Sequence, residues 1–251
     1  MKRGAGAKKA RVDELLVERG LFDSLDEARR AVFAGEVKSG RAHITAPSQT
    51  VPCDVDLSVR GAARYVSRGG FKLEHALDAL GVDPSGLRCI DAGASTGGFT
   101  DCLLQHGATT VAAVDVAYGE LADRLRRDER VAVFERTNIR EADTAALGGP
   151  FDLLVADLSF ISLVGLVDVF RGLLAPGGRA LLMVKPQFEA DRDEVAAGGV
   201  MDDPAVVARI LDEMEDSLRV AGFVVQGRCS SGLPGKKKRN QEYFVLACRT
   251  E

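Results

Sequence analysis

The sequence predicts an α/β protein in which a larger domain, built on a Rossmann-like sheet, follows a small α+β domain. Three observations support this fold class. From about residue 69 onward, apolar strand patterns alternate with helix patterns, which is typical of a mostly parallel sheet with helices on both faces. Before that point the predicted elements are short and are separated by Ser-Gly and Pro turns. The length of 251 residues is sufficient for two domains of this kind.

The first 68 residues divide into three predicted parts. Residues 1–10 are rich in Gly, Ala and Lys and show no periodicity, which predicts a disordered basic arm. Residues 11–60 contain two short amphipathic helices followed by short β segments, and Ser24 with Glu27 forms a capping box at the start of the second helix. Residues 61–68 form the linker to the second domain.

Residues 69–251 form the predicted second domain, in which strands and helices alternate. The predicted strands are 87–91, 110–115, 131–135, 151–157, 180–185, 224–229 and 243–249. The predicted helices are 69–81, 99–106, 119–127, 163–174 and 204–221. A short loop joins the last two strands, so we expect an antiparallel pair at one edge of an otherwise parallel sheet.

The composition is that of an ordinary globular protein, with 46% hydrophobic and 28% charged residues. No apolar run approaches the ~18 residues of a membrane helix, and the basic N-terminus lacks the apolar stretch of a secretory signal. We therefore expect a soluble, cytoplasmic protein with no membrane partner. The five cysteines form no C-x-x-C pair and the three histidines lack ligand-spaced partners, so no disulfide framework and no metal site are expected.

Charge is distributed unevenly along the chain, although the net charge is only −4. Residues 1–68 hold 13 Lys and Arg against 9 Asp and Glu, whereas the remainder holds 20 against 28. A small basic module joined to a larger acidic domain indicates a nucleic-acid partner.

The segment CIDAGASTGGFTD, residues 89–101, carries the features of a nucleoside-binding turn. An apolar strand runs through Asp91 into a glycine-rich turn that opens a helix, which allows close approach of a ligand to backbone N–H groups. Asp115 ends the next strand 22 residues after Gly93, where an acid can accept hydrogen bonds from a ribose. Ser95 stands in the middle glycine position of G-x-G-x-x-G, and a carboxylate beside the turn suits a cation. Both features favour S-adenosylmethionine over NAD.

Further polar residues follow or precede apolar strands. Asp157 and Lys185 each end such a strand, and a lysine at the end of a buried strand is costly unless it is paired or functional. Open α/β sheets bind ligands at this edge. Taken alone, Lys72 is consistent with a solvated helix residue, and Glu242 with a carboxylate that protects an edge strand. The four cations at 236–239 lie in a Gly/Pro loop, where they are either solvated or positioned to bind phosphates.

Several motifs together resemble the TlyA (hemolysin A) family of ribosomal RNA 2′-O-methyltransferases. They are DAGASTGGFT, VADLSFISL, VKPQFE, EYF and YVSRGG-x-KL, and the resemblance runs from about Arg11 to the C-terminus. It implies an S-four-type RNA-binding domain followed by an FtsJ/RrmJ-like, Rossmann-like class I S-adenosylmethionine-dependent methyltransferase domain. The chain departs from the family at Tyr65, where members have Trp, and in the lysine-rich loop 236–239.

The resemblance also implies site residues. The catalytic tetrad falls on Lys72, Asp157, Lys185 and Glu242. The cofactor pocket falls on Asp91, Gly93, Ser95, Gly97, Gly98, Asp115, Asn138 and Asp157. Charge and position add candidate RNA-binding residues, which are Arg11, Arg29, Arg30, Lys38, Arg41, Arg68, Lys236, Lys237, Lys238 and Arg239.

The implied activity is methylation of cytidine ribose 2′-hydroxyls in large-subunit (23S) rRNA, and in some family members also in small-subunit (16S) rRNA. We therefore expect ribosomal RNA or assembled ribosomal subunits as partners, and a monomeric enzyme. Lys185 is the expected base, because burial and the second cation Lys72 favour a neutral amine. Methylation of a base or a small molecule, RNA binding without methyl transfer, and a haemolytic activity are the alternatives.

Overall fold

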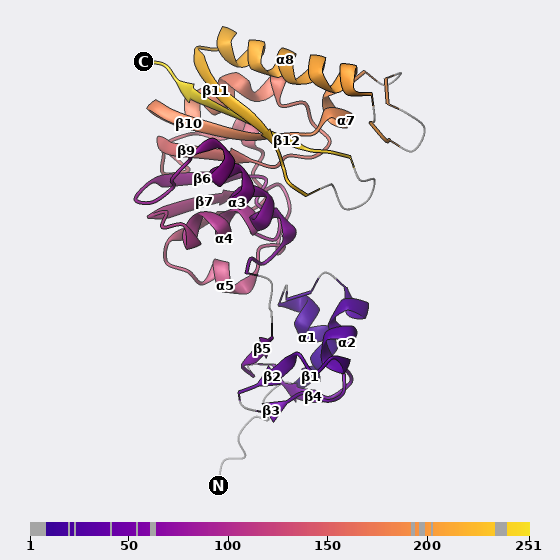
Figure 1. The fold of residues 1–251 in the computed structure, drawn as a ribbon. Helices are drawn as coiled ribbons and strands as arrows, with labels where there is room; N and C mark the ends of the chain where they lie inside the picture. The colour runs from indigo at the N-terminus through magenta and orange to yellow at the C-terminus, as the bar shows by residue number, and fades with distance from the viewer. Residues whose placement is uncertain are drawn as a thin grey trace. The chain divides into compact units, whose positions relative to one another are not determined.

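The computed structural model divides the chain into two compact units, Met1–Ser67 and Arg68–Glu251 (Figure 1). It describes residues 9–19, 21–22, 24–40, 42–53, 55–60, 64–191, 194–195, 199–201, 203–233 and 240–251. Among these residues, no helix is long and apolar enough to cross a bilayer.

The first unit consists of two helices and short antiparallel strands. Its elements are β1 Lys9–Arg11, α1 Val12–Glu18, α2 Leu25–Phe33, β2 Val37–Ser39, β3 Ala42–His43, β4 Thr50–Pro52 and β5 Leu57–Val59. The Ser24 side chain accepts a hydrogen bond from the backbone N–H of Glu27 at 3.3 Å, so the predicted N-cap of α2 is confirmed. Strand β2 pairs with β3 and β5, and β1 pairs with β4.

The core of this unit forms where the two helices meet the strands. Val12 and Leu16 of α1 pack in one cluster with Val32 of α2 and Val37 of β2. The structure differs from the predicted disordered arm at Lys9 and Ala10, which pair with Pro52 and Val51. That pairing depends on a partner strand about 40 residues away, which local periodicity does not reveal. Within the predicted linker, Tyr65 and Val66 are buried.

The second unit begins with a helix and continues as alternating strands and helices. Its strands are β6 Arg88–Ala92, β7 Thr110–Val114, β8 Val131–Phe134, β9 Phe151–Ala156, β10 Leu174–Val184, β11 Phe223–Ser230 and β12 Tyr243–Arg249. Its helices are α3 Arg68–Leu80, α4 Gly98–Gln105, α5 Asp123–Arg126, η1 Ile139–Glu141, η2 Val164–Leu166, α6 Val167–Leu173, α7 Pro186–Glu189 and α8 Pro204–Val220.

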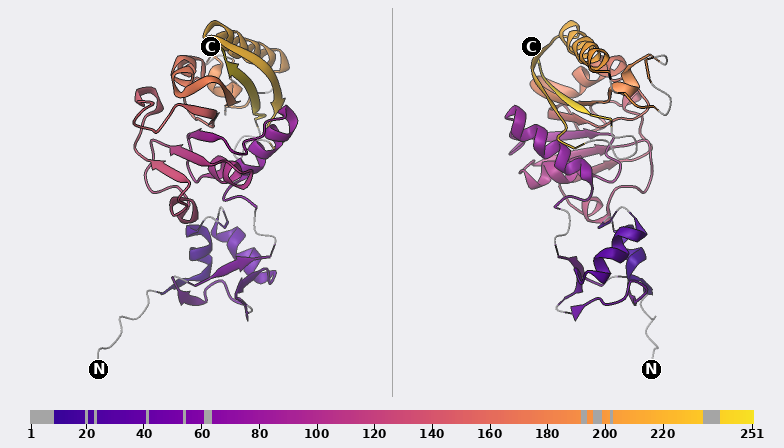
Figure 2. Two further views of the ribbon diagram at one scale, coloured as in Figure 1. Left: turned by 90° about the vertical axis from the view of Figure 1, so that its left-hand side faces the viewer. Right: turned by 45° about the vertical axis from the view of Figure 1, so that its right-hand side comes forward.

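These strands form one seven-stranded sheet in the order β11-β12-β10-β9-β6-β7-β8. The five strands from β10 to β8 are parallel, whereas β12 pairs antiparallel with both β10 and β11. Helices cover both faces of the sheet (Figure 2). The predicted parallel sheet with an antiparallel pair at one edge is therefore confirmed.

Several predicted elements have different bounds in the structure: the predicted helix 163–174 is divided into η2 and α6, and two further differences occur at glycines. The predicted helix 119–127 is reduced to α5, because Gly119 adopts a positive φ of 78° and Ala122, the residue before α5, has a ψ of 135°. The predicted strand 180–185 is the end of the longer β10, which includes the turn-like sequence Pro176-Gly177-Gly178. A register shift against β9 between Leu174 and Arg179 accommodates that sequence within the strand.

Candidate active site

The carboxyl ends of the parallel strands bring several of the predicted residues to one edge of the sheet. Asp157 follows β9 and Lys185 follows β10, while Glu242 immediately precedes β12. The strand register aligns these ends, because Leu182 pairs with Ala156 in the β10–β9 ladder. In the β10–β12 ladder, the residue before Lys185 pairs with the residue after Glu242. In open α/β sheets this edge is where ligands bind.

Lys185 lies in a buried ion pair at this edge. Its Nζ is 2.5 Å from Asp157 Oδ1 and donates a hydrogen bond to Ser159 Oγ at 2.8 Å. The residue is only 8% exposed. Burial of a lysine is tolerated where its charge is paired, and the Asp157 carboxylate supplies that pairing here. The Ser159 hydrogen bond fixes one N–H direction of Lys185, and the Asp157 carboxylate neutralises its charge.

Lys72 lies in a second buried ion pair, with Glu242 as its partner. Lys72 is on the second turn of α3, and both side chains are buried. The two residues are 170 positions apart in the sequence. The sheet therefore carries two lysine–carboxylate pairs, each drawn from the four residues of the predicted tetrad.

The turn after β6 requires glycine at two positions. Gly93 has a φ of 90°, and a Cβ there would lie 2.7 Å from the carbonyl oxygen of Asp157. Gly97 has a φ of 92°, and a Cβ there would collide with the Leu125 side chain. Gly98 then begins α4. This turn lets backbone approach a ligand closely and presents the N-terminal N–H groups of the helix.

Acidic groups lie beside the turn, around a small hollow lined in part by Ser95, Asp115 and Glu120. The backbone N–H of Ser95 donates to Asp115 Oδ2 at 2.7 Å, and its Oγ donates to Glu120 Oε2 at 2.9 Å. Carboxylates in this position can accept hydrogen bonds from a ribose. Glu120 was not among the sequence-predicted residues, and an acid in an exposed turn gives no distinctive sequence signal.

Asp91 is fully buried at the end of β6. Its Oδ2 accepts hydrogen bonds from the Thr100 backbone N–H at 2.9 Å and from Thr100 Oγ1 at 2.7 Å. Its Oδ1 has no hydrogen-bond partner among the described residues. Burial raises the pKa of Asp91 to about 7, and the nearby Asp157 and Asp115 carboxylates add to the rise. A buried carboxyl with one unsatisfied oxygen is suited to a cationic ligand group.

Asn138 has a local structural role in the structure. Its side chain accepts a hydrogen bond from the backbone N–H of Arg140 at 3.2 Å and so caps the 3₁₀ helix η1. Its role in a cofactor pocket stays a prediction.

Phe160 is a candidate functional residue that sequence reasoning missed. It is 89% exposed, has a φ of 65°, and stacks at a tilt on Phe188 with ring centroids 5.1 Å apart. Lys185 Nζ is 5.9 Å from the Phe188 ring. Among the described non-glycine residues, those with positive φ are Ser95, Arg136 and Phe160, and each follows the carboxyl end of a parallel strand. Such strained residues concentrate at functional sites.

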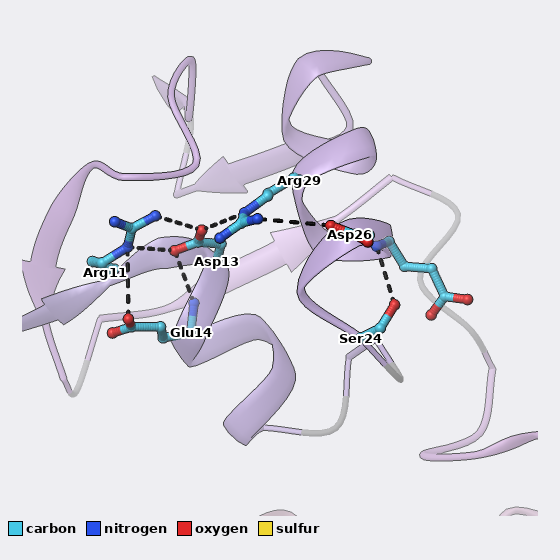
Figure 3. A network of polar contacts seen from close by, with 7 residues as sticks. Arg11, Asp13, Glu14, Ser24, Asp26 and Arg29 are labelled. Carbon is cyan, nitrogen blue, oxygen red and sulfur yellow. Dashed lines mark hydrogen bonds and ion pairs between the residues drawn. The ribbon is translucent and has the colours of Figure 1, made fainter.

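In the first unit, a buried carboxylate organises two of the candidate RNA-binding residues. Asp13 lies between the guanidinium groups of Arg11 and Arg29 (Figure 3). It accepts from Arg11 Nη2 at 2.7 Å and from Arg29 Nε at 3.0 Å. The hydrogen bond from Arg11 lowers the pKa of Asp13 to about 2. The Asp13 side chain is fully buried, whereas those of Arg11 and Arg29 are 41% and 42% exposed.

The other candidate RNA-binding residues are less constrained. Arg30 is exposed, Lys38 is half-buried, and Arg68 begins α3. Arg41 and the run Lys236–Arg239 lie outside the described residues. Over the described part of the chain, no group of three or more His, Cys, Asp or Glu has the arrangement of a metal site.

Comparison with known proteins identifies the family of the chain. Residues 65–249 match the FtsJ-like methyltransferase family. The 16S/23S rRNA (cytidine-2′-O)-methyltransferase TlyA of Mycobacterium tuberculosis is 43% identical over 241 residues, covering 95% of this chain and 90% of the relative. Hemolysin A of Brachyspira hyodysenteriae is 34% identical over 236 residues, covering 94% of this chain and 98% of the relative.

A solved hemolysin-type structure from Streptococcus thermophilus superimposes with a TM-score of 0.73 and 36% sequence identity. The match covers 97% of this chain and 89% of that chain, so both units are included. The extent and identity of these matches confirm the predicted resemblance. The chain belongs to the FtsJ-like methyltransferase family and, within it, to the TlyA (hemolysin A) family.

Proposed function

We propose that this protein is an S-adenosylmethionine-dependent methyltransferase that methylates cytidine ribose 2′-hydroxyls of ribosomal RNA. The observation that carries the proposal is the pairing of two buried lysines with two carboxylates at the ligand-binding edge. A hydroxyl must lose its proton as it attacks a methyl group, and a positioned amine is suited to accept that proton. The 43% identity to a relative named as a 16S/23S enzyme supports rRNA as the substrate, with 23S as the expected site and 16S as a second.

The residues around the β6 turn fit the cofactor. Asp91 Oδ1 is buried and unsatisfied, as a partner for a cationic group requires. Side chains at Gly93 and Gly97 would collide with neighbouring protein atoms, so the turn depends on glycine at both positions, and we assign Asp115 and Glu120 to the ribose. When bound, S-adenosylmethionine supplies an electrophilic methyl group on sulfur.

The two ion pairs take different roles in the reaction. Lys185 is assigned as the base, because Asp157 and Ser159 hold its Nζ at this edge, and the lone pair of the neutral amine is assigned to the ribose hydroxyl. Lys72 and Glu242 form the second pair and are assigned to hold the ribose in line for attack. Phe160, exposed and in contact with Phe188, is assigned to stack on an unstacked base, which is how single-stranded RNA is commonly held.

The first unit is assigned to RNA binding. Along the chain, residues 11–60 are taken as the S-four-type domain, residues 61–68 as the linker, and residues 69–251 as the catalytic domain. Arginines held by Asp13 keep exposed guanidinium surface for phosphates. We assign the protein to the cytoplasm, where ribosomal subunits are found, and to a monomeric state.

A labelling experiment tests the proposal directly. Purified protein is incubated with methyl-labelled S-adenosylmethionine and with separated, unmodified 30S and 50S subunits, and the label is mapped to base or ribose. Label on a cytidine 2′-oxygen of 50S is expected, with or without label on 30S. Label on a base would contradict the ribose assignment. No label, with cofactor binding intact, would favour an RNA-binding protein without methyl transfer.

A further inference from the structure

Glu189 connects the two segments that carry the predicted catalytic groups. It is the last residue of α7, four positions after Lys185. Its Oε2 accepts a hydrogen bond from Ser162 Oγ at 2.6 Å, and its Oε1 accepts one from the Leu163 backbone N–H at 2.8 Å. The carboxylate therefore joins the segment that begins at Lys185 to the loop that follows β9.

The loop held by Glu189 is the one that presents Ser159 and Phe160. Ser159 Oγ accepts a hydrogen bond from Lys185 Nζ. Phe160 has a left-handed backbone conformation, and its ring packs against Phe188. A single ring contact to a largely solvated phenylalanine stabilises this conformation only weakly. The strained conformation at Phe160 persists only where its surroundings hold it. The two hydrogen bonds of Glu189 act two and three residues after Phe160 and supply that restraint.

The environment of Glu189 differs from that of an ordinary surface glutamate. The side chain is half-buried, and burial raises its pKa, although the hydrogen bonds from Leu163 and Ser162 oppose the rise. Its partner Leu163 is the N-cap residue of η2, whose first N–H groups have no acceptor within their own helix. Glu189 thus caps this helix from another segment, which fixes the distance between that segment and the loop.

We infer that Glu189 is a positioning residue for methyl transfer, an inference that rests on the proposed function. It holds the loop so that Ser159 stays bonded to Lys185 and Phe160 stays beside Phe188 while RNA binds. When the restraint is removed, the loop has several positions, and the target ribose meets Lys185 in the productive geometry less often. Misplacement by about 1 Å can lower a rate about 100-fold.

Kinetics of matched variants test the inference. In Glu189→Ala, kcat is expected to fall about 10- to 100-fold, while KM for RNA and the dissociation constant for S-adenosylmethionine change less than about threefold. Glu189→Gln keeps one carbonyl oxygen that can accept the hydrogen bond from Leu163. Its kcat is expected to lie between those of Glu189→Ala and wild type. Glu213→Ala removes an exposed carboxylate of α8 and is the control, expected to match wild type. A merely structural role would instead lower the fraction of protein that binds cofactor.

A spectroscopic probe reports on the loop without any RNA. The chain contains no tryptophan, so Phe160→Trp introduces a single indole at the loop. Adding Glu189→Ala to this variant is expected to raise acrylamide quenching and lower fluorescence anisotropy, whereas adding Glu213→Ala leaves both unchanged.

The two readouts separate failure of the inference from failure of the proposed function. Wild-type kcat in Glu189→Ala, or unchanged indole fluorescence, would overturn the positioning role while methyl transfer by the wild type stands. If the wild type transfers no methyl group to RNA, the proposed function fails. The fluorescence result then still decides whether Glu189 holds the loop.

Discussion

The lysine–carboxylate pairs of the second unit and the arginine–carboxylate cluster of the first unit bury opposite partners. In the second unit the cations Lys72 and Lys185 are buried, each beside a carboxylate at the edge of the sheet. In the first unit the carboxylate of Asp13 is buried and its arginine partners remain exposed. Burial removes water from the lysines, which suits proton transfer. Exposed guanidinium groups keep N–H donors available for phosphates. The buried lysines are therefore suited to the chemical step, and the exposed arginines are suited to binding RNA.

Removing the buried cation of the second unit is expected to have the largest effect. Lys185→Ala should lower kcat by about 1000-fold or more, because it removes both the base and the partner that orients Asp157 and Ser159. Binding of S-adenosylmethionine, measured by calorimetry, should stay within about threefold of wild type. Wild-type turnover in this variant would show that another group takes the proton.

Deletion of the first unit tests the other side of the comparison. A chain lacking residues 1–60 should bind S-adenosylmethionine as the full chain does, because the β6 turn and its acids belong to the second unit. RNA methylation should fall about 100-fold or more at physiological salt, since phosphate contacts supply much of the affinity. A melting curve of the deleted chain controls for folding. Methylation that survives at the full rate would contradict the division of roles.

Asp91 is the buried carboxyl whose charge the second unit stabilises poorly without a ligand. Its pKa of about 7 lies above the ordinary value of 3.8, so the ionised form costs stability in the folded state. Stability should therefore fall as pH rises from about 4 to about 7 and level off above that. Asp91→Asn avoids this loss and should melt higher than wild type at pH 8, with a smaller difference at pH 5.

The same Asp91→Asn substitution should weaken S-adenosylmethionine binding about tenfold or more at pH 8, because a charge-assisted contact is lost. Calorimetry at both pH values measures this, and Asp115→Asn serves as the comparison, since Asp115 is only partly buried. Equal melting temperatures and equal affinities at pH 8 would show that Asp91 faces no cationic group.

How far the sequence predicts the protein differs between the fold and the site. The apolar periodicity of the sequence predicted nearly every strand and helix of the second unit, because buried parallel strands appear in a sequence as continuous apolar runs. They could not show that Lys72 meets Glu242, since pairing across 170 positions depends on how the whole sheet assembles. Resemblance to a family, rather than periodicity, brought these two residues into one predicted site.

The properties of Phe160 could not be predicted from the sequence either. Nothing in the local pattern around Phe160 indicates a left-handed backbone or an exposed ring, and phenylalanine is usually buried. The strand β1 was missed for a related reason, because Lys9 and Ala10 acquire their pairing only from β4. Both features arise from contacts between segments that are distant in the sequence.

Phe160→Ala gives a smaller expected effect within the second unit. Loss of the exposed ring should lower kcat/KM for RNA about tenfold, which corresponds to one base–aromatic stack, and leave cofactor binding unchanged. Phe160→Tyr keeps the ring and should retain most of the activity. If alanine and tyrosine variants behave alike, the ring does not contact the substrate.

The smallest effect is expected from Asp13→Asn, which removes the buried carboxylate of the first unit. The pKa of about 2 means that the ionised form is stabilised in the fold, so its contribution is present above about pH 4 and is lost as pH falls toward 2. Because both arginines are well exposed, we expect a loss of only about 1 kcal/mol at pH 7, or a few degrees in melting temperature.

Glu14→Gln is the matched control for this variant, because Glu14 is exposed and reaches Arg11 only at 3.7 Å. Its melting temperature should match that of wild type. RNA affinity should fall in Asp13→Asn alone, because Arg11 and Arg29 lose the group that holds their guanidiniums side by side. If the melting temperature drops while RNA affinity is kept, Asp13 stabilises the unit without preparing its arginines, and the binding surface lies on its other cations.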